Sequence, residues 1–174
     1  MHGAEIYEEV IKRLTYIEDG SLVWTTDPNE TGFGGVSGRI AGKVSSGGYR
    51  IVRLRRNGKR LELSAHRIIY YMHHKMLPNI LDHIDRDRLN NKIDNLRGVT
   101  ASQNSRNRTK SKSRKYIGTC QSSSGKYHAS VSVNGARIYL GTYKCEMLAA
   151  KAYDRYLINN NLSDHANLNF KQGG

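Results

Sequence analysis

The stretch Leu81–Asn104 reads LDHIDRDRLNNKIDNLRGVTASQN and holds the most informative group of side chains in the chain. A carboxylate and an imidazole stand side by side at Asp82 and His83, and two amides follow at Asn95 and Asn104. The flanking sequence is strongly basic. A metal-ligand candidate, a base and amide side chains therefore occur together among cations.

The same stretch predicts an order of local elements. LDHID is typical of a short strand, residues 86–94 are polar and loop-like, and NLRGV is extended. Thr100 is suited to cap a helix that begins at Ala101, because its hydroxyl can accept from a backbone N–H group of the first turn. We therefore expect a strand, a loop, a second strand and a helix.

These residue types suit the hydrolysis of a phosphodiester. That reaction needs a deprotonated water and a cation near the departing oxygen. An imidazole, with an ordinary pKa of about 6.5, suits the first task, and a carboxylate with an amide oxygen suits Mg²⁺. However, adjacent strand residues point to opposite faces, so Asp82 and His83 can share a pocket only if the strand twists or ends there. An isolated Asp–His pair is usually structural.

The residues before this stretch predict a helix. Ser64 is suited to the N-cap, and AHRIIYYMHHKM follows it with Ile68, Ile69 and Met72 as the buried stripe. Pro78 then ends the connection to the next strand.

Residues 1–63 predict a helix and a small β-sheet. Residues 4–17 place Ile6, Val10, Ile11 and Leu14 on one side of a helix. Short apolar runs separated by glycines then predict four strands. Their sequences are SLVW, GRIAGKV, YRIVRLRR and KRLELS.

The last two of these strands predict a basic hairpin. Asn57–Gly58 between them favours a tight turn, because both residues tolerate positive φ. Tyr49 and Ile51 are expected on one face, with Arg50 and the later arginines in solvent. From residue 39 to residue 67 the sequence has nine Lys or Arg and one acid, Glu62. A merely solvated face normally mixes both signs, so we expect a DNA-backbone contact surface. Its members are Arg50, Arg53, Arg55, Arg56, Lys59 and Arg60.

The whole chain is basic, with 28 Lys and Arg against 15 Asp and Glu in 174 residues, a net charge of +13. That excess indicates a polyanionic partner, either nucleic acid or an anionic membrane surface. The sequence contains no run long and apolar enough to cross a membrane and no secretion signal pattern. Two cysteines without a CxxC pair make a disulfide framework or a structural zinc site improbable. We expect a reduced cytoplasmic protein.

Residues 106–115, RNRTKSKSRK, contain six cations and no acid, a composition that cannot form a core. A solvated linker is one interpretation, but contact with DNA phosphates or entry into a minor groove is the better one. The residues expected to bind DNA here are Arg106, Arg108, Lys110, Lys112, Arg114 and Lys115.

The remaining sequence predicts three strands and a helix. KYIGTCQ, GKYHASVSV and ARIYLGTY are separated by turn residues, and an amphipathic helix follows over residues 146–160. That helix should bury Leu148, Ala149, Ala152, Tyr153 and Tyr156. A three-stranded sheet packed on one helix is the obvious arrangement.

The run AHRIIYYMHH…LPNILDHIDRDRLNNKIDNLRGVTASQNSRN closely resembles the HNH homing endonucleases, specifically the His-Asn-Asn type found in phages. That family places the motif on a ββα-metal fold. The resemblance implies that His83 is the general base and that Asp82 and Asn104 bind one metal ion, Mg²⁺ or Mn²⁺. It implies that Asn95 holds the loop and helps to orient the base, and that His66 has a supporting role.

Two departures from the family pattern concern the structure around the site. The family often has Asp-Gly-Asn after the catalytic His, where this chain has Asp85–Arg86–Asp87, which could alter the loop. It often has Trp where Gly98 stands, which could loosen the packing below the site. Neither change affects an expected ligand.

Residues Tyr116–Phe170 resemble an AP2-type DNA-binding domain, most clearly in GKYHASVSVNGARIYLGTY, AAKAYD and NLNF. In that family the three-stranded sheet lies in the major groove. Strand alternation turns Tyr127, Ala129, Val131 and Val133 toward the helix. Cys120 and Ser122 stand where plant members have base-contacting arginines, so we expect a loose sequence preference. The outward residues expected to contact DNA are Lys126, Ser130, Ser132, Arg137 and Tyr139.

The sequence as a whole predicts an α+β protein with four regions. They are a β-rich DNA-contact region (1–63), a ββα-metal motif (64–108), a basic linker (109–115) and an AP2-like domain (116–170). We expect a metal-dependent endonuclease that acts as a monomer on double-stranded DNA and nicks it, leaving a 5′-phosphate and a 3′-hydroxyl, in a phage-infected host cell. The main alternative is a non-catalytic DNA-binding regulator that keeps the HNH scaffold. An RNA-binding protein fits the charge but not a major-groove sheet.

Overall fold

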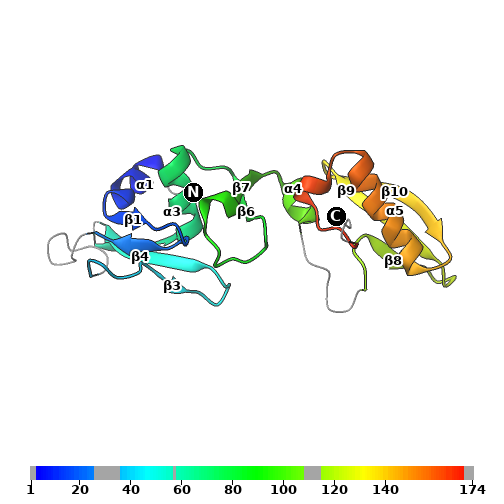
Figure 1. Ribbon diagram of the computed structural model, residues 1–174, viewed down its shortest axis with the longest axis horizontal. Coiled ribbons are helices and arrows are strands. Elements are labelled where there is room, and N and C mark those ends of the chain that lie inside the picture. Colours follow the sequence, from blue (N-terminus) through cyan, green and yellow to red (C-terminus); the bar gives the residue numbers. More distant parts are fainter. Residues whose placement is uncertain (1–2, 26–35, 57, 108–114, 171–174) are drawn as a thin grey trace. The chain divides into compact units, whose positions relative to one another are not determined.

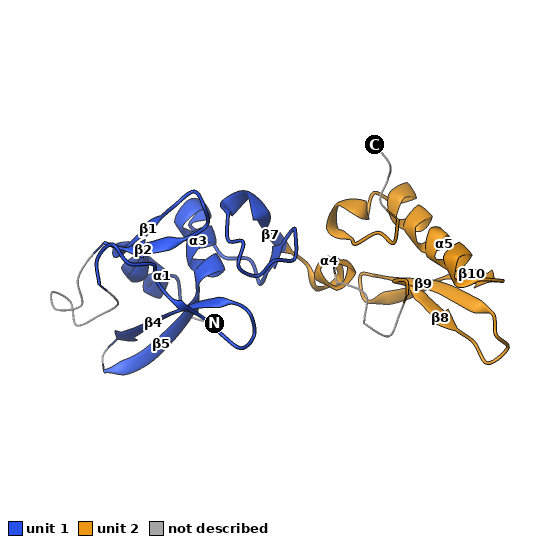
Figure 2. Cartoon of the chain, turned by 60° about the horizontal axis from the view of Figure 1, so that its bottom comes forward, with its two compact units in different colours: residues 1–98 blue, residues 99–174 orange. Residues whose placement is uncertain are grey.

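The structure, a computed structural model, describes residues 3–25, 36–56, 58–107 and 115–170. It forms two compact units, residues 1–98 (unit 1) and 99–174 (unit 2) (Figure 2). Both combine helices with small antiparallel sheets, as the sequence predicts (Figure 1). Over these described ranges, no helix is long and apolar enough to cross a membrane.

The described residues of unit 1 form three sheets and two α-helices. Antiparallel pairing joins β1 to β2, β3 to β4 to β5, and β6 to β7. The last strand, β7, ends one residue past the boundary of the unit. The elements are α1 (Ala4–Ile11), β1 (Leu14–Tyr16), β2 (Leu22–Trp24), β3 (Lys43–Val44), β4 (Arg50–Arg56), β5 (Lys59–Ser64), α3 (Ala65–His74), β6 (Ile80–His83), the 3₁₀ helix η1 (Ile93–Asn95) and β7 (Leu96–Val99).

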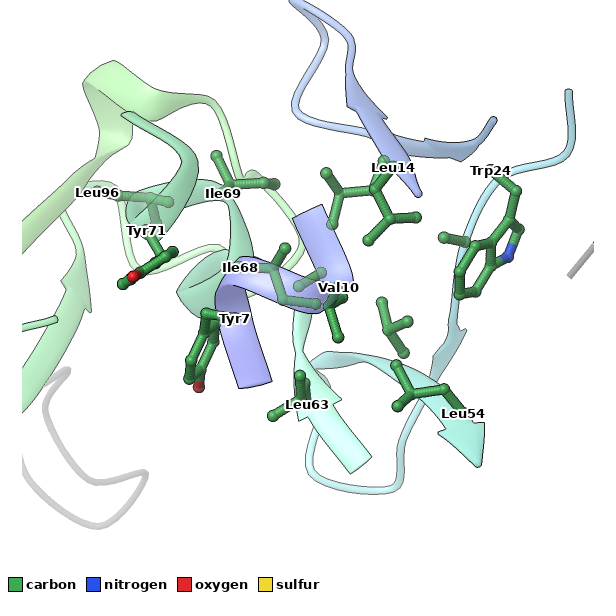
Figure 3. Packing of buried hydrophobic residues seen from close by; sticks show 14 residues of the cluster. Tyr7, Val10, Leu14, Trp24, Leu54, Leu63, Ile68, Ile69, Tyr71 and Leu96 are labelled. Carbon is green, nitrogen blue, oxygen red and sulfur yellow. The ribbon is translucent and has the colours of Figure 1, made fainter. Parts of the chain in front are cut away.

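One hydrophobic core connects these elements. Figure 3 shows Val10 of α1, Leu63 of β5 and Ile68 of α3 among its members. The core also takes Trp24 from β2 and Leu96 from β7. The boundary expected after residue 63 therefore lies inside a shared core, and α3 packs on the β-rich region as well as beside the β6–β7 pair.

The first helix is shorter than the sequence predicts. It ends at Ile11, and Leu14 belongs to β1, where it pairs with Trp24 of β2. Leu14 remains buried in the same core. The 3.6-residue spacing of the apolar residues was correct for burial but wrong for conformation, because pairing with β2 overrides the local preference.

The expected faces of the basic hairpin are shifted by one residue. Val52 and Leu54 are the buried residues of β4, at 0% and 4% exposure, while Tyr49 and Ile51 are only half-buried. Arg50 lies on the same face as Val52 by alternation, and its Nη1 donates to the carbonyl of Gly42 at 3.1 Å. Arg50 is therefore partly engaged inside the unit. Asn57, the expected turn residue, lies outside the described residues.

In unit 2, the residues that the structure describes form a short helix, a three-stranded antiparallel sheet of order β10-β9-β8, and a long helix in contact with all three strands. This is the arrangement that its sequence predicts. Its elements are α4 (Ala101–Arg106), β8 (Thr119–Gln121), β9 (Tyr127–Val133), β10 (Ala136–Tyr143), α5 (Glu146–Asn159) and the 3₁₀ helix η2 (Ser163–His165).

The buried face of α5 differs in part from the expected one. Ala149 and Tyr153 are buried as predicted, but Leu148 is 45% exposed and Leu157 is fully buried instead. The buried face of α5 is therefore rotated relative to the expected one, because residues 149, 150, 153 and 157 pack against the sheet. Ala129 and Val131 of β9 are buried beneath this helix, as strand alternation predicts.

Candidate active site

The centre of the candidate site is the loop between β6 and β7, residues 84–95. Its two ends are joined by a backbone hydrogen bond from Ile84 N to the Asn95 carbonyl, at 2.9 Å. The paired strands on either side make a short antiparallel ribbon. The strand–loop–strand part of the expected motif is therefore present, and it belongs to unit 1.

His83 is the last residue of β6 and is only 3% exposed. Its Nε2 lies 3.0 Å from Oδ1 of Asn91, a loop residue that is 1% exposed. An amide oxygen can only accept, so the ring donates its Nε2–H. In the neutral ring this leaves the lone pair on Nδ1, which makes that atom the basic one.

Asn91 was not recognised in the sequence as a functional residue. It is preceded by a second asparagine, Asn90, and nothing local separates the two. The structure separates them by burial, since Asn91 is enclosed while the Asn90 side chain donates outward to Asp85 Oδ2 at 2.6 Å.

Two aromatic residues complete the surroundings of His83. The His66 ring, from the first turn of α3, lies 5.1 Å away in an edge-to-face arrangement. The Tyr49 ring lies 5.2 Å from His66 and 6.1 Å from His83. The pKa of His66 is lowered to about 3, chiefly by burial and also by the nearby His83 and Arg67. His66 is therefore a neutral wall of the site at ordinary pH.

Asn95 lies at the base of the loop and holds it closed. Its Nδ2 donates to Asp85 Oδ1 at 2.8 Å and to the Asn90 carbonyl at 2.7 Å, and its Oδ1 accepts from Asp85 N at 3.1 Å. Burial acts to raise the pKa of Asp85, but hydrogen bonds from Asn90, Asn95 and the Asp87 backbone outweigh it and lower that pKa. These contacts define the shape of the loop.

The loop is also attached to three other parts of unit 1. Arg88 donates from Nη1 to the Gly47 carbonyl at 2.7 Å, and its guanidinium stacks 4.8 Å from the Tyr49 ring. Ile93 N donates to the Tyr16 hydroxyl at 3.2 Å. Gly20, in the β1–β2 turn, lies so close that a Cβ there would be 2.7 Å from Lys92 N. The position of Asn91 is thus fixed from several sides.

Asp82 has different neighbours from His83, as expected for adjacent strand residues. Its Oδ2 accepts from Nε and Nη2 of Arg97 on β7, at 3.2 and 3.1 Å. Both side chains are largely buried, at 12% and 16% exposure. Arg97 was not recognised in the sequence, because its pairing with Asp82 across the ribbon depends on the register of the two strands.

Asn104 lies on α4, in unit 2, and its side chain is exposed. The helix begins as the sequence predicts. Thr100 Oγ1 accepts from Gln103 N at 3.2 Å, and Gln103 Oε1 accepts from Thr100 N at 2.7 Å, which forms a reciprocal capping box.

The donor chemistry is that of a hard divalent ion. The part of the chain that the structure describes contains no group of three His, Cys, Asp or Glu side chains suited to a metal. A carboxylate such as that of Asp82 supplies the hard oxygen ligand that Mg²⁺ prefers, with water and phosphate oxygens as further ligands. Mg²⁺ is bound in this way in many proteins, through one or two protein oxygens and substrate phosphates.

The structure accommodates both departures from the family pattern, at Arg86 and at Gly98. Arg86 stands where the family often has Gly, and its φ is +70°, a conformation that non-glycine residues adopt at some cost. Gly98 stands where Trp is frequent, but Pro78 covers it so closely that a Cβ would lie 2.9 Å from Pro78 Cβ. The packing at Gly98 is therefore tight, contrary to the loosening expected from the sequence.

The basic hairpin of unit 1 is less uniformly positive than its sequence suggests. Arg53 and Arg60 both pair with Glu62, at 2.8 and 3.3 Å, and Arg56 pairs with Glu9 at 2.9 Å. Glu9 comes from α1, so it could not be counted from the hairpin alone. Exposed ion pairs contribute only about 0–1 kcal/mol, so these arginines can still exchange their partner for a phosphate.

Of the basic segment 106–115, the structure describes only the two ends. Arg106 is 6% exposed, and its guanidinium donates into the fold, so its assignment to a DNA-contact surface is wrong. Lys115 is exposed and lies over the Tyr116 ring. The expected DNA contacts outside the described residues are Arg108, Lys110, Lys112 and Arg114.

On the outward face of the C-terminal sheet, polar side chains of β9 and β10 are linked by hydrogen bonds. Arg137 Nε donates to Ser130 Oγ at 3.0 Å, and Tyr139 is 61% exposed. The His128 ring contacts the hydroxyls of Tyr139 and Thr142, which also contact each other. Lys126 and Ser132 are exposed, as expected for outward residues.

Comparison with known proteins identifies part of the chain. Residues 64–106 match the family model described as HNH endonuclease. A solved structure described as "DNA binding and cleavage by the HNH homing endonuclease I-HmuI" is similar over 51% of this chain and 47% of that chain, with 22% identity and a TM-score of 0.38. The chain thus spans about half the length of that protein. The search among curated proteins gave no match. The family match thus places an HNH endonuclease domain in residues 64–106.

Proposed function

We propose that this protein is a metal-dependent endonuclease of the homing type, which nicks double-stranded DNA and leaves a 5′-phosphate and a 3′-hydroxyl. The observation that carries the proposal is the hydrogen bond from buried His83 to Asn91, within the segment that matches the HNH family. That bond leaves Nδ1 as the basic atom of the neutral ring.

In the proposed reaction, His83 accepts a proton at Nδ1 from the water that attacks the phosphorus. Asn91 orients the ring, and His66 and Tyr49 exclude competing water from one side of it. Asp82 and Asn104 would hold one Mg²⁺ or Mn²⁺ ion, with Arg97 fixing the rotamer of Asp82. When bound, the ion stabilises negative charge on the departing 3′ oxygen. Asn95 keeps the loop that carries Asn91 in shape.

The proposed DNA contacts lie both before and after the proposed catalytic residues in the sequence. The exposed cations of the hairpin, the basic segment after α4 and the outward face of the C-terminal sheet would supply them. Arg137 is the one side chain of that sheet able to contact a guanine bidentately, so affinity would come mainly from phosphate contacts. The C-terminal sheet and helix fit an AP2-like use of the major groove. We propose a monomer with one site, hence a nick.

The test is cleavage of supercoiled plasmid DNA with and without Mg²⁺ by the wild type, His83→Ala and a matched control, His74→Ala at the exposed end of α3. We expect His83→Ala to lower cleavage by at least about 100-fold, the usual contribution of a general base, with DNA affinity unchanged. DNA ligase should reseal the nicked product, since it requires a 5′-phosphate beside a 3′-hydroxyl.

Equal losses of cleavage and affinity in His83→Ala would contradict its role as the base. A wild type that binds DNA but does not cut it with Mg²⁺ or Mn²⁺ would favour the DNA-binding regulator instead.

A further inference from the structure

Helix α4 is too short to be stable by itself. It has six residues, and helices below about 12 residues are marginal in water without tertiary packing. The capping box provides hydrogen-bond partners for backbone N–H groups at the start of the helix. The orientation of the helix, however, has to come from contacts with other elements. All the contacts described here lie within unit 2.

The first set of contacts joins α4 to β9. Arg106 Nη1 donates to Ser102 Oγ at 2.7 Å and to the Ser132 carbonyl at 3.2 Å. Ser102 Oγ also accepts from Asn134 N, at 3.0 Å. Ser102 and Arg106 are four residues apart and share one face of the helix, so this face is fastened to the end of β9 and its turn.

The second contact joins the end of α4 to the C-terminal segment. Asn167 N, shortly after η2, donates to the Arg106 carbonyl at 3.0 Å. The same segment is tied to α5, because Asp154 accepts from the backbone N–H groups of Asn169 and Phe170. The last carbonyl of α4, that of Arg106, is therefore anchored to a part of the chain about 60 residues away.

Asn104 lies on the opposite side of this short helix from Ser102 and Arg106. Two residues along a helix correspond to a rotation of about 200°, so a residue between two anchored ones points away from the anchor. This matches the exposure of Asn104 and the burial of Arg106.

We propose that the C-terminal module, residues 116–170, is the structural support of the metal-ligand helix, with Ser102 and Arg106 as positioning residues for Asn104. The inference rests on the proposed function in one respect, the role of Asn104 as a ligand. It gives the module a second role besides DNA binding, since its strand β9 holds in place a helix of the nuclease motif.

The experiment uses full-length protein and measures Mn²⁺ binding by electron paramagnetic resonance in the absence of DNA. The variants are Ser102→Ala, Ser102→Thr, Asn104→Ala and a matched control, Ser124→Ala, whose hydroxyl contacts Ser122 in the β8–β9 turn. Loss of the groups that orient a ligand typically lowers metal affinity about 10- to 100-fold. We expect such a loss in Ser102→Ala, recovery in Ser102→Thr and no change in Ser124→Ala.

A second measurement separates positioning from DNA binding. For Ser102→Ala, the Mg²⁺ concentration that gives half-maximal cleavage at saturating DNA should rise, while the DNA dissociation constant in EDTA should stay within twofold of the wild type. Should Ser102→Ala fail to fold, Arg106→Lys replaces it. The lysine keeps the charge but cannot reach both oxygens at once, so the same increase in the Mg²⁺ requirement is expected.

The two hypotheses fail in different ways. If Ser102→Ala or Arg106→Lys binds Mn²⁺ like the wild type while Asn104→Ala does not, the supporting role of the module is overturned and the ligand set stands. If Asn104→Ala binds Mn²⁺ like the wild type, or the wild type binds none, the proposed ligand set is overturned.

Discussion

At the scale of single residues, two features define the environment of His83. Its ring donates a hydrogen bond that selects one tautomer, and aromatic rings pack against it. Asn91 accepts the Nε2–H, and His66 packs edge-on against the ring. The pKa of His66 is lowered to about 3, chiefly by burial. Each of these neighbours leads to a prediction.

Replacing Asn91 by Ala should lower the rate of cleavage at saturating DNA about 10- to 100-fold, because the ring of the proposed general base, His83, loses its orientation. DNA affinity should stay the same, since Asn91 is buried. The matched control is Asn90→Ala, which removes the same side chain one residue earlier and leaves the bond to His83 in place. Equal rates for the two variants would contradict an orienting role for Asn91.

Protonation of His66 should destabilise unit 1 in weak acid. The folded-state pKa lies below the unfolded value of about 6.5, so the unfolded chain takes up the proton first and stability is lost as the pH falls below 6.5. From pH 7 to pH 5 this amounts to about 2 kcal/mol. In urea unfolding, His66→Gln should lose that part of the pH dependence. A variant with the wild-type pH dependence would show that His66 is not its source.

At the scale of elements, the β6–β7 loop is shaped by its own hydrogen bonds and positioned by other parts of unit 1. Asn95 and Asp85 close it, while Tyr16, Gly47 and the β1–β2 turn hold it from outside. The β1–β2 pair thus supports the loop that carries Asn91. Gly20 is the point of closest approach, with φ +90°.

Gly20→Ala should lower both stability and cleavage. The added Cβ would lie 2.7 Å from Lys92 N and 2.8 Å from Asn91 C, so the backbone that carries Asn91 must shift. We expect a loss of about 1–3 kcal/mol in unfolding free energy and a fall in cleavage beyond what the stability loss explains.

The control is Gly38→Ala, which has a similar φ of +78° but nothing within 4 Å of the added Cβ. It should carry the backbone strain without affecting the loop. Identical cleavage rates in the two variants would mean that Gly20 does not position Asn91.

At the scale of the whole molecule, the excess of 13 positive charges is spread over both units. In unit 1 it is concentrated on the β4–β5 hairpin, where Glu62 and Glu9 offset part of it. In unit 2 one of the expected DNA contacts, Arg106, is used inside the fold instead. DNA affinity should therefore depend on the exposed cations, among them Arg55 and Lys59.

The DNA association constant should fall steeply with salt, with a log–log slope of about −0.9 for each phosphate contacted. Replacing both Arg55 and Lys59 by Ala should make the slope shallower by about 1.8, because two contacts are lost. The exposed Lys12→Ala, outside the expected surface, serves as the control. A wild-type slope near zero would exclude an interface driven by the DNA backbone, and an unchanged slope in the double variant would exclude the hairpin from it.

The amino-acid sequence by itself determined the features that depend on neighbouring residues. The strand–loop–strand–helix order, the Thr100 capping box, the β9–β10 hairpin and the alternation of Ala129 and Val131 all follow from local preferences and from spacing along the chain. Composition and motif also identified the residues that are capable of the chemistry, among them His83 and Asp82.

Only the tertiary structure decided the features that depend on contacts between distant residues. It distinguished Asn91 from Asn90, turned Leu14 from helix to strand, brought Glu9 to the basic hairpin, and buried Arg106 against β9. The physical reason is the same in each case. Burial and long-range hydrogen bonding outweigh local preference by more than the few tenths of a kcal/mol that separate one conformation from another in an isolated segment.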